Sequence, residues 1–117
     1  MKKVYVISRY RAEFPERVEF NKEVARHFCR KIVEEGDMPV APHLFYTQFL
    51  DESDPIERDA GLEYGLVDLR TCDEYLVVVI DGVISEGMAG ELSEAGRIGM
   101  RGRIISITMP EVCELLK

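Results

Sequence analysis

The chain has 117 residues, 46% of them hydrophobic, and a formal net charge of −7 at pH 7. This length suits one core, so we expect residues 1–117 to form a single domain. The acidic balance argues against a nucleic-acid polymer as a partner, because proteins that bind one by phosphate attraction carry a basic patch. A small anionic ligand stays compatible with this charge, since one arginine and a few backbone amides can hold a phosphate locally.

The cysteines and the N-terminal sequence indicate in which cellular compartment the protein is expected. Cys29, Cys72 and Cys113 lie far apart with no Cys-x-x-Cys pair, which predicts free, buried thiols rather than a disulfide framework or a zinc site. Free thiols are typical of a reducing compartment. The N-terminus lacks the apolar length of a signal peptide and no segment approaches a membrane span, so we expect a cytoplasmic protein without a membrane partner.

Strand and helix patterns alternate through the first half of the chain. Residues 4–7 form a short apolar run that predicts a buried strand, and a polar turn follows at 8–11. Residues 15–36 begin with a proline, repeat apolar side chains at helical spacing and end in a glycine, which predicts a helix. A second strand is expected at 38–41, followed by a loop over 42–54 with many apolar side chains.

A third unit opens at Asp54. Aspartate is a good N-cap, the proline after it suits the first helical position, and Glu57 stands where a capping-box partner would. We expect this helix to run to about Arg70. The nearly pure hydrocarbon run 75–80 then predicts the central strand. A helix over 87–99, a strand over 103–107 and a last helix over 110–116 complete the expected elements.

Strands that alternate with helices predict an α/β fold with a parallel sheet. We expect a three-layer, flavodoxin-like or Rossmann-like sheet of four to five strands, with helices on both faces, right-handed crossovers and the order 2-1-3-4. In such sheets the ligand cleft lies where the strand order reverses, here between the first and third strands. Three segments meet there: residues 8–11, the loop from His43 onward, and residues 81–87.

Glu91 is a carboxylate close to an apolar helix face. On a helical wheel Met88, Leu92 and Ala95 fall in one stripe, and Glu91 lies on the flank of that stripe near the helix N-terminus. The helix dipole favours a carboxylate there, although its partial burial costs desolvation. Two interpretations stay open: a functional group at the cleft, or a first-turn glutamate that only compensates the dipole.

Several polar residues accompany Glu91 at the expected cleft. Ser8, Arg9 and Arg11 make a hydroxyl and guanidinium turn suited to a phosphate or carboxylate, and Ser85 lies opposite on the third loop. Asp68 supplies a second carboxylate. Neither a P-loop pattern nor a dinucleotide-binding glycine pattern is present, and we expect no cofactor and no metal.

These residues resemble the nucleoside 2-deoxyribosyltransferase-like superfamily, and within it the (deoxy)nucleoside 5′-monophosphate N-glycosidases. The resemblance covers most of the chain, and its specific element is Ser85-x-Gly87-x-x-x-Glu91-Leu92-x-x-Ala95. It implies hydrolysis of the N-glycosidic bond of a nucleotide, with release of the free base and a sugar phosphate. Weaker points of resemblance are Val4-Tyr5, the turn 8–11, Ala41-Pro42-His43-Leu44, Asp68-Leu69 and Cys72-Asp73.

The resemblance assigns catalytic roles to three side chains. Glu91 matches the family's catalytic glutamate, which attacks the anomeric carbon or, in some members, assists water directly. Asp68 matches an aspartate that orients the sugar hydroxyls and the glutamate. The alternative is that Asp68 is an exposed helix residue without a role in the site. Tyr5 matches a tyrosine at the base of the cleft, whereas a tyrosine on a first strand is often a core residue.

Ser85 bears on the choice between subclasses. Family transferases that act on nucleosides carry an aspartate six residues before the glutamate, whereas the monophosphate hydrolases carry a serine that donates to a 5′-phosphate. Serine here, together with Arg11 and the Ser8 and Arg9 amides, therefore favours a nucleotide. The adjoining Gly87 and Met88 are expected to contact the substrate as well.

The loop after the second strand holds further candidates. His43 falls where this family can contact the base, or it is simply a polar residue satisfied within a turn. Phe45, Tyr46 and Phe49 could stack on the base, line a dimer interface or pack together.

Two features depart from the family pattern. The turn after the first strand usually carries a glycine and here has none, and the chain ends soon after the last strand. Family members commonly form homodimers or higher oligomers in which a neighbouring subunit completes the site; Ser106 and Thr108 are the nearby polar candidates here. The alternative functions are a nucleoside deoxyribosyltransferase, a non-catalytic module that binds or senses a nucleotide or nucleoside, and a purely structural dimer.

Overall fold

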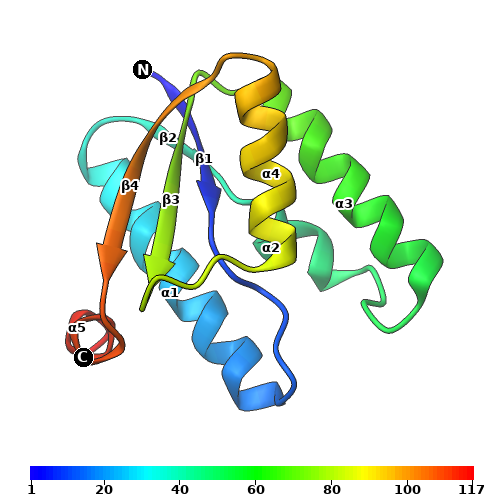
Figure 1. Ribbon diagram of the computed structural model, residues 1–117, viewed down its shortest axis with the longest axis horizontal. Helices are drawn as coiled ribbons and strands as arrows, with labels where there is room; N and C mark the ends of the chain where they lie inside the picture. The colour runs from blue at the N-terminus through cyan, green and yellow to red at the C-terminus, as the bar shows by residue number, and fades with distance from the viewer.

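The computed structural model describes all of residues 1–117 and shows a parallel sheet between two layers of helices (Figure 1). The sheet has four strands in the order β2-β1-β3-β4, so the predicted α/β class and strand order are confirmed. Every neighbouring pair is parallel. The strands are β1 (Lys3–Ile7), β2 (Met38–Val40), β3 (Glu74–Ile80) and β4 (Arg101–Ile107).

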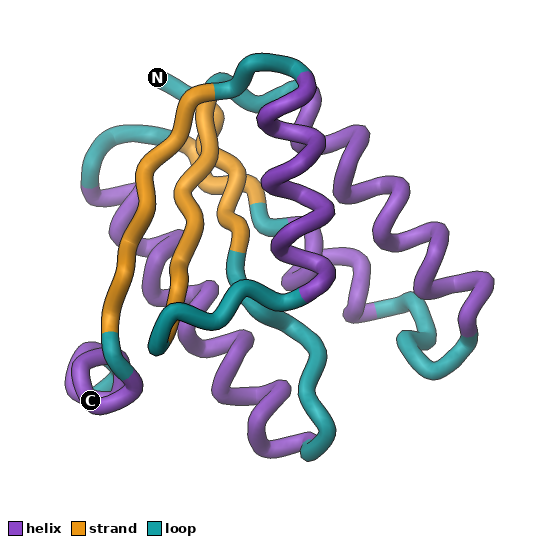
Figure 2. The backbone as a smooth tube through the Cα atoms, viewed as in Figure 1, coloured by secondary structure: helices purple, strands orange, loops and turns teal.

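Helices cover both faces of the sheet, as expected (Figure 2). Helices α1 and α5 pack on one face, and α3 and α4 pack on the other. The short α2 and a single 3-10 turn, η1, follow β2 and lie beside α3. The helices are α1 (Pro15–Glu34), α2 (Pro42–Phe45), η1 (Tyr46–Gln48), α3 (Pro55–Arg70), α4 (Glu86–Arg97) and α5 (Met109–Leu115).

The alternation of side chains along β1 divides the core into two clusters. Val4 and Val6 point to the α1 face, whereas Tyr5 and Ile7 point to the α3 and α4 face. Each of these four side chains is at most 1% exposed, and burying one aliphatic side chain of this size contributes about 1.5–3 kcal/mol. The same alternation therefore places the Tyr5 phenol on the α3 and α4 face of the sheet, where it lines the cleft.

The segment 42–54 differs from the predicted loop, because it begins with α2 and η1. Pro42 occupies the first turn of α2, where its fixed φ suits a helix. The rings of Phe45, Tyr46 and Phe49 then meet edge to face, with centroids 5.1–6.1 Å apart. Helices this short show no apolar periodicity, so the sequence pattern did not indicate them.

The N-terminus of α3 confirms the predicted cap and corrects the predicted capping box. Asp54 Oδ1 accepts a hydrogen bond from the Ile56 amide at 2.9 Å. Glu57 Oε1 accepts from the Asp51 amide at 3.1 Å instead of from Asp54. The Asp54 amide already donates to the Asp51 carbonyl, which leaves it no hydrogen for Glu57.

The three cysteines are free, but the prediction that all are buried is wrong. Cys29 and Cys72 are half-buried, and Cys113 is exposed on α5, beside the fully buried Val112. A seven-residue helix presents only one side to the core, so adjacent positions on it face opposite environments. None of the helices has the length and apolar character needed to cross a bilayer.

Candidate active site

An open cleft of about 850 Å³ lies at the carboxyl ends of β1 and β3, on the α3 and α4 side of the sheet. This is the reversal point of the strand order, where the sequence predicted the cleft. The cleft brings together every site residue predicted from the sequence except Asp68. Those lining it are Tyr5, Ser8, Arg9, Arg11, His43, Ser85, Gly87, Met88 and Glu91.

Tyr5 and Glu91 form a hydrogen-bonded pair at the floor of this cleft. The Tyr5 hydroxyl donates to Glu91 Oε2. Burial raises the pKa of Glu91 to about 7, and the hydrogen bond from Tyr5 opposes that rise. Burial, followed by the charge of Glu91, raises the pKa of Tyr5, so the phenol stays protonated as a donor. The pair therefore holds a partly desolvated carboxylate, more basic than an ordinary glutamate, in a fixed orientation.

A glycine on α3 leaves room for the Tyr5 hydroxyl. A β-carbon at Gly65 would lie 3.2 Å from the Tyr5 hydroxyl oxygen, closer than most contacts of this kind. The absence of a side chain at Gly65 thus lets α3 pack against β1 while the phenol reaches Glu91.

Asp68 lies behind the cleft wall instead of in the cleft. Its Oδ2 accepts a hydrogen bond from the Tyr46 hydroxyl at 2.9 Å, and Tyr46 itself lines the cleft. The charge of Asp68 also contributes to the raised pKa of Tyr5. Asp68 is therefore positioned to orient the Tyr46 side chain and to influence Tyr5, and it makes no hydrogen bond with Glu91.

His43 and Ser8 pair on the opposite wall. The Ser8 hydroxyl lies 3.1 Å from His43 Nε2, and Ser8 is 7% exposed. Burial lowers the pKa of His43 to about 4, so the ring is neutral at physiological pH. The Tyr10 ring meets it edge to face, with centroids 6.1 Å apart. His43 is both a satisfied polar residue and part of the cleft wall, so the two interpretations of this residue are compatible.

The N-terminus of α4 opens into the cleft. Ser85 is the N-cap, and its Oγ accepts from the Met88 amide at 3.3 Å, which leaves the hydroxyl proton free to donate. A β-carbon at Gly87 would meet no atom within 4 Å, so the first turn is open to a ligand. Free amides and the positive end of the helix dipole favour an anion here. Glu86 is exposed at the same edge.

An arginine side chain braces the turn after β1, which contains no glycine. Arg9 Nε donates to the Arg11 carbonyl at 3.2 Å, and both side chains line the cleft. Arg11 is exposed, as is Arg9, so each guanidinium keeps donors available to a ligand.

The face of α3 supplies cleft residues that no sequence motif indicates. Arg58, Gly61, Leu62 and Gly65 line the cleft at helical spacing, and Asp59 adjoins them. Arg58 Nε is buried without a hydrogen-bond partner. The spacing of these residues is visible in the sequence, but it becomes informative only once α3 is known to form a wall. Tyr46, Thr47 and Glu52 from the preceding segment complete that side.

Comparisons with known proteins support the fold. Residues 2–105 match a family described as a domain of unknown function, DUF7768. A search of curated proteins finds no match. A solved 2-deoxyribosyltransferase from Bacillus psychrosaccharolyticus, described as a biocatalyst for nucleoside synthesis, is similar with a TM-score of 0.69 and 18% identity over 89% of this chain and 72% of that one.

A second solved structure, the 2-deoxyribosyltransferase from Leishmania mexicana, has a TM-score of 0.55 and 16% identity over 91% of this chain. This chain spans 65% of that protein's length. At these identities the likeness concerns the fold, and the resemblance noted in the sequence is confirmed at that level. The chain belongs to the family described as domain of unknown function DUF7768, and it has the fold of the 2-deoxyribosyltransferases.

Proposed function

We propose that the protein hydrolyses the N-glycosidic bond of a (deoxy)nucleoside 5′-monophosphate. The observation that carries the proposal is the Tyr5–Glu91 pair, a partly buried carboxylate oriented by a phenol on the floor of a cleft. The N-terminus of α4, which favours an anion, opens into the same cleft. The carboxylate would face the anomeric carbon at one end of a sugar phosphate, and the N-terminus of α4 would bind the phosphate at the other end.

In the proposed reaction Glu91 attacks the anomeric carbon of the sugar. Its Oε2 is held by Tyr5, which leaves Oε1 for the attack. The bond between the sugar and the base breaks, the base leaves with the bonding electrons and takes up a proton from water, and the sugar becomes esterified to Glu91. Positive charge that develops on the sugar is stabilised by the carboxylate. Water then cleaves the ester, and the products are the free base and a sugar phosphate.

The phosphate is proposed to bind at the N-terminus of α4. Ser85 would donate its hydroxyl proton, the free amides at Glu86 and Gly87 would donate as well, and Arg11 would supply charge. Serine at the N-cap favours a phosphate, because an aspartate in the same place would repel the dianion. Ser8 and Arg9 complete this proposed anion site, with Met88 beneath it.

The base is proposed to lie between His43 and the wall formed by α2, η1 and α3. The neutral His43 ring and the Tyr46 ring both line this part of the cleft. Asp68 would act through Tyr46, since the 2.9 Å hydrogen bond fixes that phenol. The resemblance adds a homodimer or higher oligomer to this proposal, which the molecular mass in solution tests.

A nucleoside deoxyribosyltransferase is the second candidate function. The fold likeness to two 2-deoxyribosyltransferases favours it. In that reaction a second base, instead of water, would capture the sugar from Glu91. Ser85 at the cleft favours the hydrolase over this alternative, because the family's transferases carry an aspartate at that position.

Chromatography of free base tests the proposal. The protein is incubated with a panel of ribo- and deoxyribonucleoside 5′-monophosphates and the matching nucleosides, with and without a second base. The expected result is base release from a monophosphate, its loss in Glu91→Gln, and no effect of Glu114→Gln, an exposed control on α5. Release of base only when a second base is present identifies a transferase. Saturable binding without any product indicates a binding module.

A further inference from the structure

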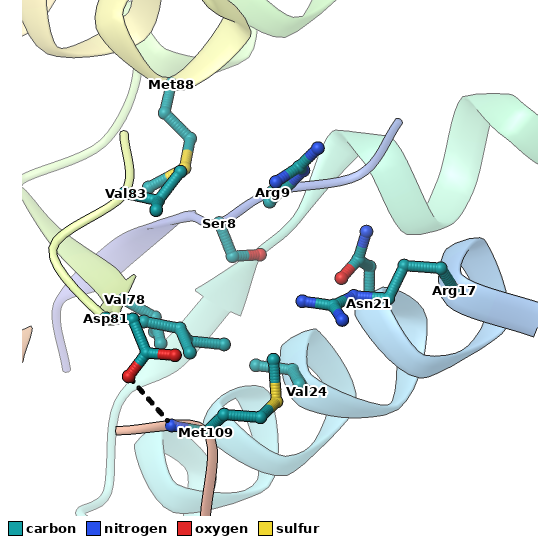
Figure 3. Close-up of a pocket in the computed structure, with 11 residues that line it drawn as sticks. Ser8, Arg9, Arg17, Asn21, Val24, Val78, Asp81, Val83, Met88 and Met109 are labelled. Atoms are coloured by element: carbon teal, nitrogen blue, oxygen red, sulfur yellow. Dashed lines mark hydrogen bonds between the residues drawn. The ribbon is translucent and has the colours of Figure 1, made fainter. Parts of the chain in front are cut away.

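A second, smaller pocket of about 80 Å³ adjoins the cleft on the α1 side of β1 (Figure 3). It shares Ser8, Arg9 and Met88 with the cleft, so the two spaces meet around the end of β1. Its volume suits a single small polar group and is too small for a sugar or a base. The remaining lining residues are Arg17, Asn21, Val24, Val78, Ile80, Asp81, Val83 and Met109.

Three polar side chains line this space, one from the residue after β1 and two from α1. Figure 3 shows the Ser8 hydroxyl and the Arg17 guanidinium directed toward each other, with the oxygen of the Asn21 amide turned toward them and its nitrogen turned away. Asn21 is 3% exposed, and its Nδ2 donates to the Tyr10 carbonyl at 3.0 Å. That bond fixes the orientation of the amide.

Arg17 is the unusual member of this group. Its Nε is buried and has no hydrogen-bond partner, and no carboxylate lies within salt-bridge distance of its guanidinium. The guanidinium lies 5.0 Å from the centre of the Phe20 ring, which holds it in place. Buried polar groups are almost always paired, so an unpaired arginine donor at a pocket points to a ligand that pairs with it.

The other charges around the pocket favour an anion. Arg9 adds a second cation to Arg17, and Asp81 is the single carboxylate. Asp81 Oδ1 accepts a hydrogen bond from the Met109 amide at 3.1 Å, so part of its charge is already compensated. Val24 and Val78 form an apolar floor, and a less polar surrounding strengthens the attraction between the arginines and an anion.

We propose that this pocket binds a second phosphate group of the nucleotide seated in the cleft, so that the preferred ligands are nucleoside 5′-diphosphates. The proposal rests on the proposed function, which places the first phosphate at the N-terminus of α4. The distal phosphate then lies beside Ser8 and is held by the Ser8 hydroxyl and the Arg17 guanidinium. Arginine suits this task because its planar fork pairs with two phosphate oxygens at once.

Calorimetry with a matched nucleoside 5′-monophosphate, the 5′-diphosphate and inorganic pyrophosphate tests this subsite. The diphosphate should bind wild-type protein roughly 10- to 100-fold more tightly than the monophosphate, as expected for charge-assisted hydrogen bonds to a guanidinium. Arg17→Met should remove that difference and leave the affinity for the monophosphate unchanged. Arg17→Lys should keep only part of it.

Two further variants separate the subsite from general effects of charge and folding. Arg30→Met removes the same charge from an exposed position on α1 and should keep the preference for the diphosphate. Val83→Phe fills the pocket from a residue that is 49% exposed, so it should fold normally and abolish the preference. Equal affinity for the two nucleotides in wild-type protein, or a preference that survives Arg17→Met, overturns the proposal.

The subsite and the proposed hydrolysis can fail separately. If a monophosphate releases its base through Glu91 but diphosphates bind no more tightly, the subsite is wrong and the proposed function stands. If diphosphate and pyrophosphate bind in a manner that depends on Arg17 but no base is released, the subsite stands and the hydrolysis is wrong.

Discussion

The Tyr5 hydroxyl donates a hydrogen bond to Glu91 Oε2, and this contact joins the central part of the sheet to the helix whose N-terminus opens into the cleft. It stabilises the ionised form of a carboxylate that burial would otherwise keep protonated. The contact explains how one glutamate is both partly desolvated and available as a base or nucleophile near neutral pH.

Tyr5→Phe should slow base release at pH 7 by roughly 10- to 100-fold and move the pH profile to higher pH. The hydrogen bond lowers the pKa of Glu91, so its removal lets burial raise that pKa further above 7. Activity that needs an ionised Glu91 then recovers as the pH rises. A pH–rate profile checks this, with Tyr64→Phe on the exposed part of α3 as a control. A profile unchanged by Tyr5→Phe would show that the phenol does not tune Glu91.

Glu91→Gln should stabilise the fold at pH 8 by about 1–3 kcal/mol relative to wild-type protein. The pKa of Glu91 is raised in the folded state from its ordinary 4.5 to about 7. The folded protein therefore binds the proton more tightly than the unfolded chain, and stability is lost as the pH rises through the window from 4.5 to 7. Urea unfolding at pH 4 and pH 8 measures this, and the two proteins should differ little at pH 4.

His43 should make the free energy of unfolding fall as the pH falls, the opposite of the effect of Glu91. Its pKa is lowered from 6.5 to about 4 in the folded state, so the unfolded chain binds the proton more tightly. Stability is present above pH 6.5 and is lost as the pH falls through the window from 6.5 to 4. Comparing Glu91→Gln with the double variant that also carries His43→Gln isolates this effect. The double variant should lose less stability between pH 6.5 and pH 4, and equal losses would contradict the burial of a neutral ring.

Gly65→Ala should lower the catalytic rate more than it lowers stability. The added β-carbon would lie 3.2 Å from the Tyr5 hydroxyl and should displace it from Glu91. In the same exchange a helical glycine becomes alanine, which favours the helix by about 1 kcal/mol. The matched control is Gly96→Ala on α4, where a β-carbon meets no atom within 4 Å. Parallel losses of rate and melting temperature at position 65 would indicate a merely structural role.

The strand order and most of the cleft could be predicted from the sequence because both depend on local patterns. The apolar runs that end at Ile7 and Ile80 fix the two central strands, and the polar residues after them must meet at one edge of a parallel sheet. The place of Glu91 at the cleft also follows from a local pattern, its position on a helical wheel.

The remaining site residues reach the cleft or the pocket only because helices pack beside them in the tertiary structure. Arg58 lines the cleft only because α3 forms one wall, and Arg17 reaches its pocket only because α1 crosses below the end of β1. Asp68 carries the resemblance in sequence, yet Tyr46 from the unpredicted η1 stands between it and the cleft. These contacts join side chains that are far apart along the chain, so the spacing of residues within one helix or strand cannot predict them.

Rapid acid quenching followed by peptide mass spectrometry tests the central claim most directly. Under single-turnover conditions with a nucleoside 5′-monophosphate, the peptide that contains Glu91 should gain the mass of the sugar phosphate as the base is released, and Glu91→Gln should show neither adduct nor base. Base release by Glu91→Gln at the wild-type rate, or an adduct on another residue, would contradict Glu91 as the nucleophile.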